Sequence, residues 1–288
     1  TRKAFVRLGV GCGLSEVVAL LADSEELREA ATLRRSEVKA LFEINCSSDI
    51  RFPLLNDKAK AKSKTNCAKI KTHAQKAHLL LQLRAAGVPL GEFSACESML
   101  LLGARRVLRA LIDFLVGEGH ARPLCAAVVL RKCLERGAGW HDDSQAEARQ
   151  LEGIGPVLGQ RLREAKAGSL SALVDLSPAR LEQLCSRPAG AGMKLLAAAR
   201  GLLSARPLLS AEVAAAPPHG KTSAVTVRVS LAVPSSAPGA QQAQPPPPQR
   251  QTTGDARWLL LVADDQGRLQ HVRRFAAAQL AQSGQLAF

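Results

Sequence analysis

The sequence predicts a mainly α-helical protein with a small β domain at its C-terminal end. Three observations support this fold class. Aromatic residues make up only 3% of the chain while Ala and Leu are abundant, which favours helices. A Gly-Ile-Gly-Pro turn at residues 153–156 lies between two segments with apolar residues at helical spacing. After Arg206, apolar residues begin to alternate with polar ones, as is typical of strands.

Size and charge restrict the functions open to this chain. Its 288 residues, 47% of them hydrophobic, can bury a substantial core and indicate two or three domains. The net charge of +14 predicts a polyanionic partner. We expect nucleic acid and no membrane, because the sequence lacks an apolar run of about 18 residues. The chain begins at Thr1 without Met and shows no signal peptide, so we expect a fragment of a longer protein.

The cysteines predict neither a zinc site nor a disulfide framework. They are odd in number and scattered, and no two have Cys-x-x-Cys spacing. We therefore expect buried thiols in a reducing compartment. The seven cysteines are Cys12, Cys46, Cys67, Cys96, Cys125, Cys133 and Cys185.

Residues 1–45 are predicted to form short helices that lead into a bundle. Ser15 can cap a helix over residues 16–22, a second helix follows over 24–31, and a third covers 33–44. Residues 49–53 should be extended, since the residue before a proline avoids the helical region.

Residues 46–140 are predicted to form a helical bundle that contains a basic loop at residues 58–76. This loop holds seven lysines and no acid. It can contact phosphates or be a solvated insertion, and the residues alone leave both open. An apolar helix follows over 77–86. The lysines are Lys58, Lys60, Lys62, Lys64, Lys69, Lys71 and Lys76.

A long helix is predicted over residues 93–116. At about 100° per residue, its leucines and alanines share one side, while Arg105, Arg106 and Arg109 lie opposite. Asp113 is the acid nearby. Three arginines with so little compensation suit phosphate contact, although surface arginines can also be merely solvated. Another apolar helix is expected over 123–136.

Residues 141–205 contain the Gly-Ile-Gly turn. Gly153 and Gly155 bracket Ile154, and a proline follows that suits the first position of a helix. Residues 147–151 can close a helix before the turn. N–H groups at the start of the next helix, which carries Arg161, suit a phosphate, so this segment resembles the helix-hairpin-helix DNA-binding motif.

Two features keep another interpretation of the turn open. Val157 stands where a basic residue often follows in that motif. A plain αα-hairpin that only packs would have the same pattern. A second, degenerate pair of helices is expected over residues 169–203.

Residues 206–288 are predicted to form a small β domain. Strands are expected at 208–213, 225–233, 258–263 and 269–274, and Asp264-Asp-Gln-Gly267 is a hairpin signal. A Pro- and Gln-rich insert at 235–254 should be unstructured. A complete sandwich needs about seven strands, so we expect either that the chain stops inside its last domain and truncates the sandwich, or that this domain is unusually reduced.

No active site is predicted. Ala215–Thr222 fits a loose phosphate-loop pattern, but it carries two prolines and runs into a strand, whereas a phosphate loop leads into a helix. The six histidines are dispersed, and neither a Ser-His-Asp arrangement nor paired carboxylates can be argued.

The order of these elements resembles a known family. Leu33–Asn45, Ile50-Arg-Phe-Pro53, Gly103–Phe114 and Leu151-Glu-Gly-Ile-Gly155 are similar to the C-terminal region of meiotic crossover-promoting DNA helicases. That region is the SEC sixty-three-type module of the Ski-two-like superfamily. It combines a helical bundle, a helix-hairpin-helix and an immunoglobulin-like sandwich. The longer basic loop and the interrupted sandwich depart from the family pattern.

The resemblance implies an accessory region of an ATP-dependent DNA helicase in the nucleus. ATP and Mg would bind motor domains that lie in cis but outside this chain. The expected partners are single-stranded or branched DNA, those motor domains, and proteins on the β domain. In the family the arginine-bearing ratchet helix contacts the translocating strand, and Arg106 and Arg109 match its two arginines. The alternatives are a protein-interaction module of a spliceosomal-type RNA helicase and an RNA helicase accessory region. The residues expected to bind nucleic acid are Arg105, Arg106, Arg109, Gly153, Ile154, Gly155, Arg161, Lys58, Lys60, Lys62 and Lys64.

Overall fold

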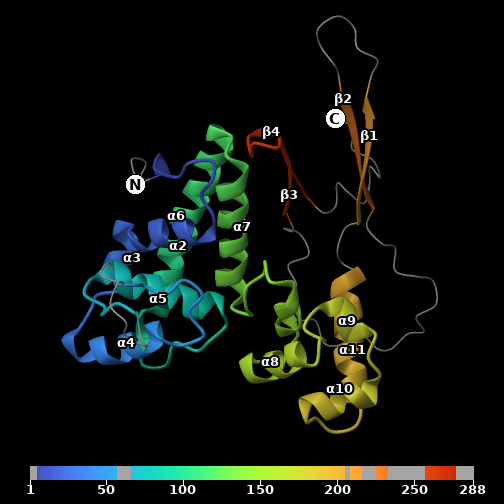
Figure 1. Ribbon diagram of the computed structural model, residues 1–288, viewed down its shortest axis with the longest axis horizontal. Helices are drawn as coiled ribbons and strands as arrows, with labels where there is room; N and C mark the ends of the chain where they lie inside the picture. Colours follow the sequence, from blue (N-terminus) through green and yellow to red (C-terminus); the bar gives the residue numbers. More distant parts are fainter. Residues whose placement is uncertain (1–4, 57–65, 205–207, 216–224, 233–256, 277–288) are drawn as a thin grey trace, which may run out of the picture.

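The computed structural model describes residues 5–56, 66–204, 208–215, 225–232 and 257–276 (Figure 1). It confirms the predicted fold class, because helices form most of the chain and antiparallel strands follow at its C-terminal end. The helices enclose two separate hydrophobic cores, one contributed mainly by residues 5–134 and one by residues 148–203.

The first core is built around one helix that is buried on nearly all sides. This helix, α5 (His73–Ala85), has Leu79, Leu80 and Leu81 with no exposed surface. Around it lie α2 (Leu14–Ala22), α3 (Glu25–Ala30), α4 (Val38–Asn45) and α7 (Ala121–Arg136), and α6 (Glu97–Glu118) packs against α2, α3 and α7. A short 3₁₀ helix, η2 (Gly91–Cys96), leads into α6.

Two details of the N-terminal helices differ from the prediction. Ser15 does not cap α2, because the helix begins at Leu14, two residues earlier than predicted. Gly13 is the N-cap residue, and the Glu16 carboxylate accepts a hydrogen bond from its N–H. The helix expected over residues 33–44 is split into a 3₁₀ turn, η1 (Arg35–Glu37), and α4. Glu37 accepts the Arg34 N–H at 2.9 Å, and this local bond favours the tighter turn at the helix start.

The basic loop is shorter than predicted. Thr72 caps α5, so residues 73–76 are helical. Lys76 is 4% exposed, and its Nζ lies 2.7 Å from Glu37 Oε2 and 2.8 Å from the carbonyl oxygen of Thr32. Lys76 is therefore part of the core packing and is not available to a ligand. Lys58, Lys60, Lys62 and Lys64 lie outside the described residues.

The two ends of the basic loop are joined by a buried asparagine. The Asn45 side chain donates to the carbonyl oxygens of Leu54 and Ala68 and accepts the Leu54 N–H, all within 3.0 Å. Leu55 and Cys67 form an antiparallel bridge beside it. The chain therefore leaves and re-enters the bundle at one fixed stem, so the lysine-rich segment starts and ends at the same place.

The second core is made of short helices. They are η3 (Ser144–Gln150, a 3₁₀ helix), α8 (Pro156–Glu164), α9 (Leu170–Val174), α10 (Pro178–Cys185) and α11 (Ala191–Ser204). A pair of helices was predicted over residues 169–203, and the structure has three there, α9, α10 and α11. The element before the hairpin is 3₁₀ and not the α-helix that we expected, because the Asp143 carboxylate accepts the Gln145 N–H and tightens the first turn.

All four predicted strands are present, in two separate antiparallel ladders. β1 (Leu208–Ala215) pairs with β2 (Val225–Ala232), and β3 (Arg257–Ala263) pairs with β4 (Leu269–Ala276). Within the described residues the two ladders do not share a sheet, so the truncated sandwich is reduced to two hairpins. The insert at 235–254 lies outside the described residues.

The β3–β4 hairpin is attached to the bundle at the turn between α6 and α7 (Figure 1). The N–H of Leu269 donates to the carbonyl oxygen of Gly119 at 2.7 Å, and the N–H of Ala121 donates to that of Gly267 at 3.1 Å. Leu261 and Leu269 pack against the first core. This hairpin therefore belongs to the bundle surface.

The cysteines are all free thiols, but not all are buried as predicted. Cys133 and Cys185 are buried, while Cys46 and Cys125 are exposed. Burial raises the pKa of the Cys133 thiol to about 11. None of the described helices has the length and apolar character required to cross a bilayer.

Candidate nucleic-acid interface

The exposed face of α6 carries three arginines, which we call the arginine ridge: Arg105, Arg106 and Arg109. All three side chains are exposed, while Leu100, Ala104 and other residues on the opposite face are buried in the first core. No carboxylate of the described residues lies within ion-pair distance of the ridge. The predicted division of α6 into a core face and a cationic face is thus present in the structure.

Asp113, the acid expected to offset the ridge, has another partner. Its Oδ1 lies 2.7 Å from a guanidinium nitrogen of Arg274 on β4. The nearest acid on this face of α6 is therefore neutralised by a residue from the C-terminal hairpin, and the ridge keeps its positive charge.

The Gly-Ile-Gly turn has the backbone conformation that its glycines predict. Gly153 has φ +80°, a region that residues with a Cβ rarely adopt. Gly155 is the extended residue before α8, and Pro156 takes the first helical position. Gly155 is an exposed residue, and its N–H has no hydrogen-bond acceptor within the described residues, so it can donate to a ligand.

Side chains around the turn divide into core and surface. Ile154 is 5% exposed and packs in the second core, which corrects its place among the expected binding residues: it fixes the turn but its side chain cannot reach a strand. Val157 is 67% exposed where a basic residue would strengthen the site. Arg161 is exposed on α8 and donates to Ser186 Oγ at 3.3 Å.

A second glycine turn leads into α11, and it was not among the predicted elements. Gly190 has φ +89°, and Gly192 follows two residues later, in the same spacing as Gly153 and Gly155. Here the N–H groups are already used: Glu182 Oε1 accepts the N–H of Gly190 at 2.7 Å and that of Gly192 at 3.0 Å. The Gly-Ala-Gly repeat could have signalled this turn, but not its internal acceptor.

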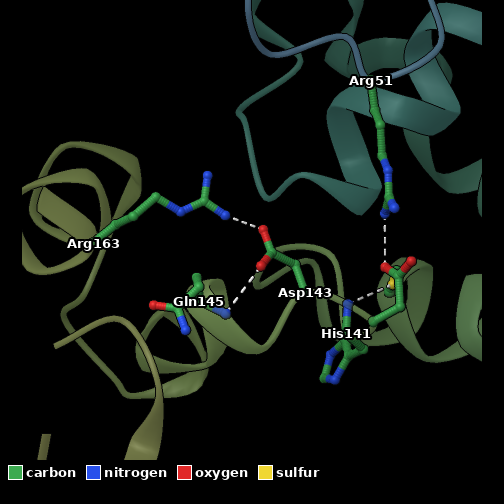
Figure 2. Close-up of polar contacts among 7 residues, drawn as sticks. Arg51, His141, Asp143, Gln145 and Arg163 are labelled. Atoms are coloured by element: carbon green, nitrogen blue, oxygen red, sulfur yellow. Dashed lines mark hydrogen bonds and ion pairs between the residues drawn. The ribbon is translucent and has the colours of Figure 1, made fainter. Parts of the chain in front are cut away.

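Two consecutive aspartates connect the bundle to the second core (Figure 2). Asp142 pairs with Arg51 of the bundle at 2.8 Å, and Asp143 pairs with Arg163 of α8. Asp143 also accepts the N–H of Gln145 at 2.9 Å. These contacts link α8, and with it the glycine turn, to the bundle.

The Ile50–Pro53 segment supplies the bundle side of this joint. The Arg51 guanidinium lies over the rings of Phe52 and Trp140, 5.4 and 5.3 Å from their centroids, so it is oriented toward Asp142. The carbonyl oxygen of Phe52 accepts hydrogen bonds from His78 Nε2 and Gln82 Nε2. Burial lowers the pKa of His78, and the neutral ring donates through Nε2.

Those predicted binding residues that the structure describes are thus gathered in two places, while Lys58, Lys60, Lys62 and Lys64 lie outside the described ranges. The arginine ridge lies on the bundle, while Gly153, Gly155 and Arg161 lie on the second core, separated from α6 (Figure 1). Neither place contains a metal-binding group, since no cluster of three His, Cys, Asp or Glu side chains occurs among the described residues. Guanidinium groups and free N–H groups suit an anionic ligand.

A helical bundle, a glycine-turn unit of short helices and a reduced β region, in this order, are the architecture expected of a SEC sixty-three-type accessory region. The chain belongs to the Sec63 Brl domain family, whose model matches residues 3–288. This family is an accessory region of Ski-two-like helicases. A comparison with functionally curated proteins gives no significant match.

Proposed function

We propose that this chain is the nucleic-acid-binding accessory region of an ATP-dependent DNA helicase that acts in meiotic recombination in the nucleus. The arginine ridge carries the proposal: three exposed guanidinium groups on one rigid helix, with no carboxylate of the described residues paired to them. The Leu33–Asn45 and Ile50–Pro53 sequences support the meiotic branch. ATP and Mg would bind motor domains in cis, and this chain would hold the single-stranded or branched DNA that they move.

The ridge is suited to a strand that must slide. Arg106 and Arg109 are one turn apart, so their guanidinium groups can reach neighbouring phosphates while the opposite face stays packed. Contacts to phosphates carry no sequence information, so a strand can advance by one nucleotide and form the same contacts with the ridge.

The glycine turn would add a weaker contact. It offers exposed N–H groups but no basic side chain at Val157. A hydrogen bond between neutral groups contributes about 0.5–1.5 kcal/mol, against roughly 1.5–3 kcal/mol where one group is charged. The ridge should therefore dominate binding, and the turn should support it.

The proposal is tested with a labelled single strand in a fluorescence anisotropy titration. The double variant Arg106→Ala/Arg109→Ala should lose about tenfold or more in affinity, which corresponds to roughly 1.4 kcal/mol. Lys132→Ala/Arg136→Ala on α7 is the matched control, because it removes the same charge from another exposed helix surface. Equal losses in both variants would mean that only net charge matters, and no loss in either would refute the proposal.

One observation favours the alternative, a protein-interaction module of a spliceosomal-type RNA helicase. A cleft of about 380 Å³ lies between α4 and the segment from α5 to η2. Its lining includes the apolar residues Ile44, Val88 and Phe93 and the acidic residues Glu43, Asp49 and Glu92. Such a cleft repels phosphates and suits a cationic, apolar peptide. If the ridge variants bind DNA and RNA as the parent does, this alternative becomes the better explanation.

A further inference from the structure

We propose that the nucleic-acid-binding surface continues from α6 onto the C-terminal β hairpin, with Arg274 of β4 as a fourth strand-binding arginine. This inference rests on the proposed function of the arginine ridge and adds a residue and a second structural element to it. The juxtaposition of Asp113 and Arg274, 161 residues apart in sequence, carries the inference.

The hairpin is held beside α6 without help from Arg274. Backbone hydrogen bonds attach it to the α6–α7 turn, and Leu261 and Leu269 pack on the bundle. Leu261 is paired with Val272, and residues two apart on a strand point to the same side, so Arg274 points to the bundle side as Val272 does. The position of Arg274 beside α6 is thus fixed by the register of the strand.

The ion pair with Asp113 has little to do with stability. The two side chains are 54% and 55% exposed, and an ion pair this open to solvent adds little to the free energy of unfolding. The electrostatic effect of the pair is more important than its effect on stability. Asp113 is one turn beyond Arg109 on the same side of α6, so without Arg274 its carboxylate would repel a phosphate bound there.

Arg274 can neutralise Asp113 and bind a phosphate at the same time. A guanidinium has five N–H donors in one plane, and the pair uses only part of them. With half of its side chain exposed, the remaining donors are open to a ligand. The cationic side chains therefore form a row along α6 from Arg105 to Arg109 that continues to Arg274. A row of this kind suits an extended single strand of nucleic acid.

The test is a double-mutant cycle with Asp113→Asn, Arg274→Ala and the variant with both changes, measured on a labelled single strand. Arg274→Ala should lower affinity by about tenfold, since it removes a charged contact and exposes Asp113. For this variant the slope of log K against log salt should become shallower by roughly 0.7, which corresponds to one lost phosphate contact. Asp113→Asn should bind at least as tightly as the parent. Removing Arg274 in the Asp113→Asn background should cost clearly less than in the parent.

Three further measurements separate this inference from its alternatives. Arg274→Lys should keep most of the salt slope, because the charge is retained. If Arg274→Ala and Asp113→Asn lower both the melting temperature and the affinity, the pair only docks the hairpin and the inference fails. Arg106→Ala/Arg109→Ala is measured in parallel: if it alone loses affinity, only the continuation onto β4 is wrong, and if no variant loses affinity, the proposed function fails as well.

Discussion

The buried Lys76 of α5 should be required for stability and not for binding, unlike the exposed arginines of the ridge. Lys76 Nζ lies 2.7 Å from Glu37 Oε2, and the two side chains are only 5% and 14% exposed. Lys76→Met keeps the length of the side chain and its packing near the Phe93 ring but removes the charge. Because Glu37 would then be a buried carboxylate without its cation, the free energy of unfolding should fall by about 3–5 kcal/mol.

Urea denaturation followed by circular dichroism measures this loss. The double variant Lys76→Met/Glu37→Leu should recover most of the stability, since it leaves no unpaired charge in the core. Affinity for single strands should not change in any folded variant, because Lys76 does not reach the surface. A loss below about 1 kcal/mol in Lys76→Met would show that this lysine behaves as an exposed side chain, and would refute the packing described above.

The same pair has a defined pH dependence. Burial raises the pKa of Glu37, but hydrogen bonds from Lys76 and from the Arg34 amide outweigh burial and leave the pKa below its usual value. The contribution of Glu37 is therefore present above the unfolded carboxyl pKa of about 4.3 and is lost as pH falls through the lower folded pKa. The stability difference between the parent and Lys76→Met should narrow in that acid range, and a constant difference would contradict the assignment.

Three further predictions concern the surface. Gly153→Ala should lower the free energy of unfolding in urea by about 1–2 kcal/mol because of the positive φ. Gly155→Ala should lower it little, because φ is an ordinary −79° and an added Cβ would meet no atom within 4 Å; equal losses would contradict the turn geometry. Val157→Lys should raise duplex affinity in an anisotropy titration, and an unchanged value would mean that the turn only packs. Replacing Lys58, Lys60, Lys62 and Lys64 by Gln should lower the salt slope by up to about 0.7–0.9 for each lost contact, and an unchanged slope would mean that these lysines are only solvated.

Features that depend on local periodicity could be predicted from the sequence. The buried and exposed faces of α6 follow from the spacing of its leucines and arginines. The positive φ of Gly153 follows from the Gly-Ile-Gly-Pro pattern, and β2 follows from the alternation of apolar and polar residues. The pairing of β3 with β4 follows from the turn signal at residues 264–267. In each case the residues that determine the structure lie within one or two turns or along one strand.

Contacts between distant segments could not be predicted. Lys76 lies in a lysine-rich run and has the pattern of a solvated residue, yet its partner Glu37 is 39 residues away. The role of Glu182 as a hydrogen-bond acceptor could not be predicted either, because only the folded chain brings its carboxylate to the N–H groups of Gly190 and Gly192. The pattern of a single sequence does not show which distant polar groups form contacts. These contacts determine which charged side chains remain available to a ligand.

The salt dependence of single-strand binding tests the central claim most directly, because it counts the phosphate contacts that the arginine ridge makes. Log K is measured against log salt for the parent, for Arg106→Ala/Arg109→Ala and for the control Lys132→Ala/Arg136→Ala. Two lost contacts should reduce the slope by about 1.4 in the ridge variant and leave the control at the parent value. A ridge variant with the parent's slope and an unchanged melting temperature would show that these arginines contact no strand.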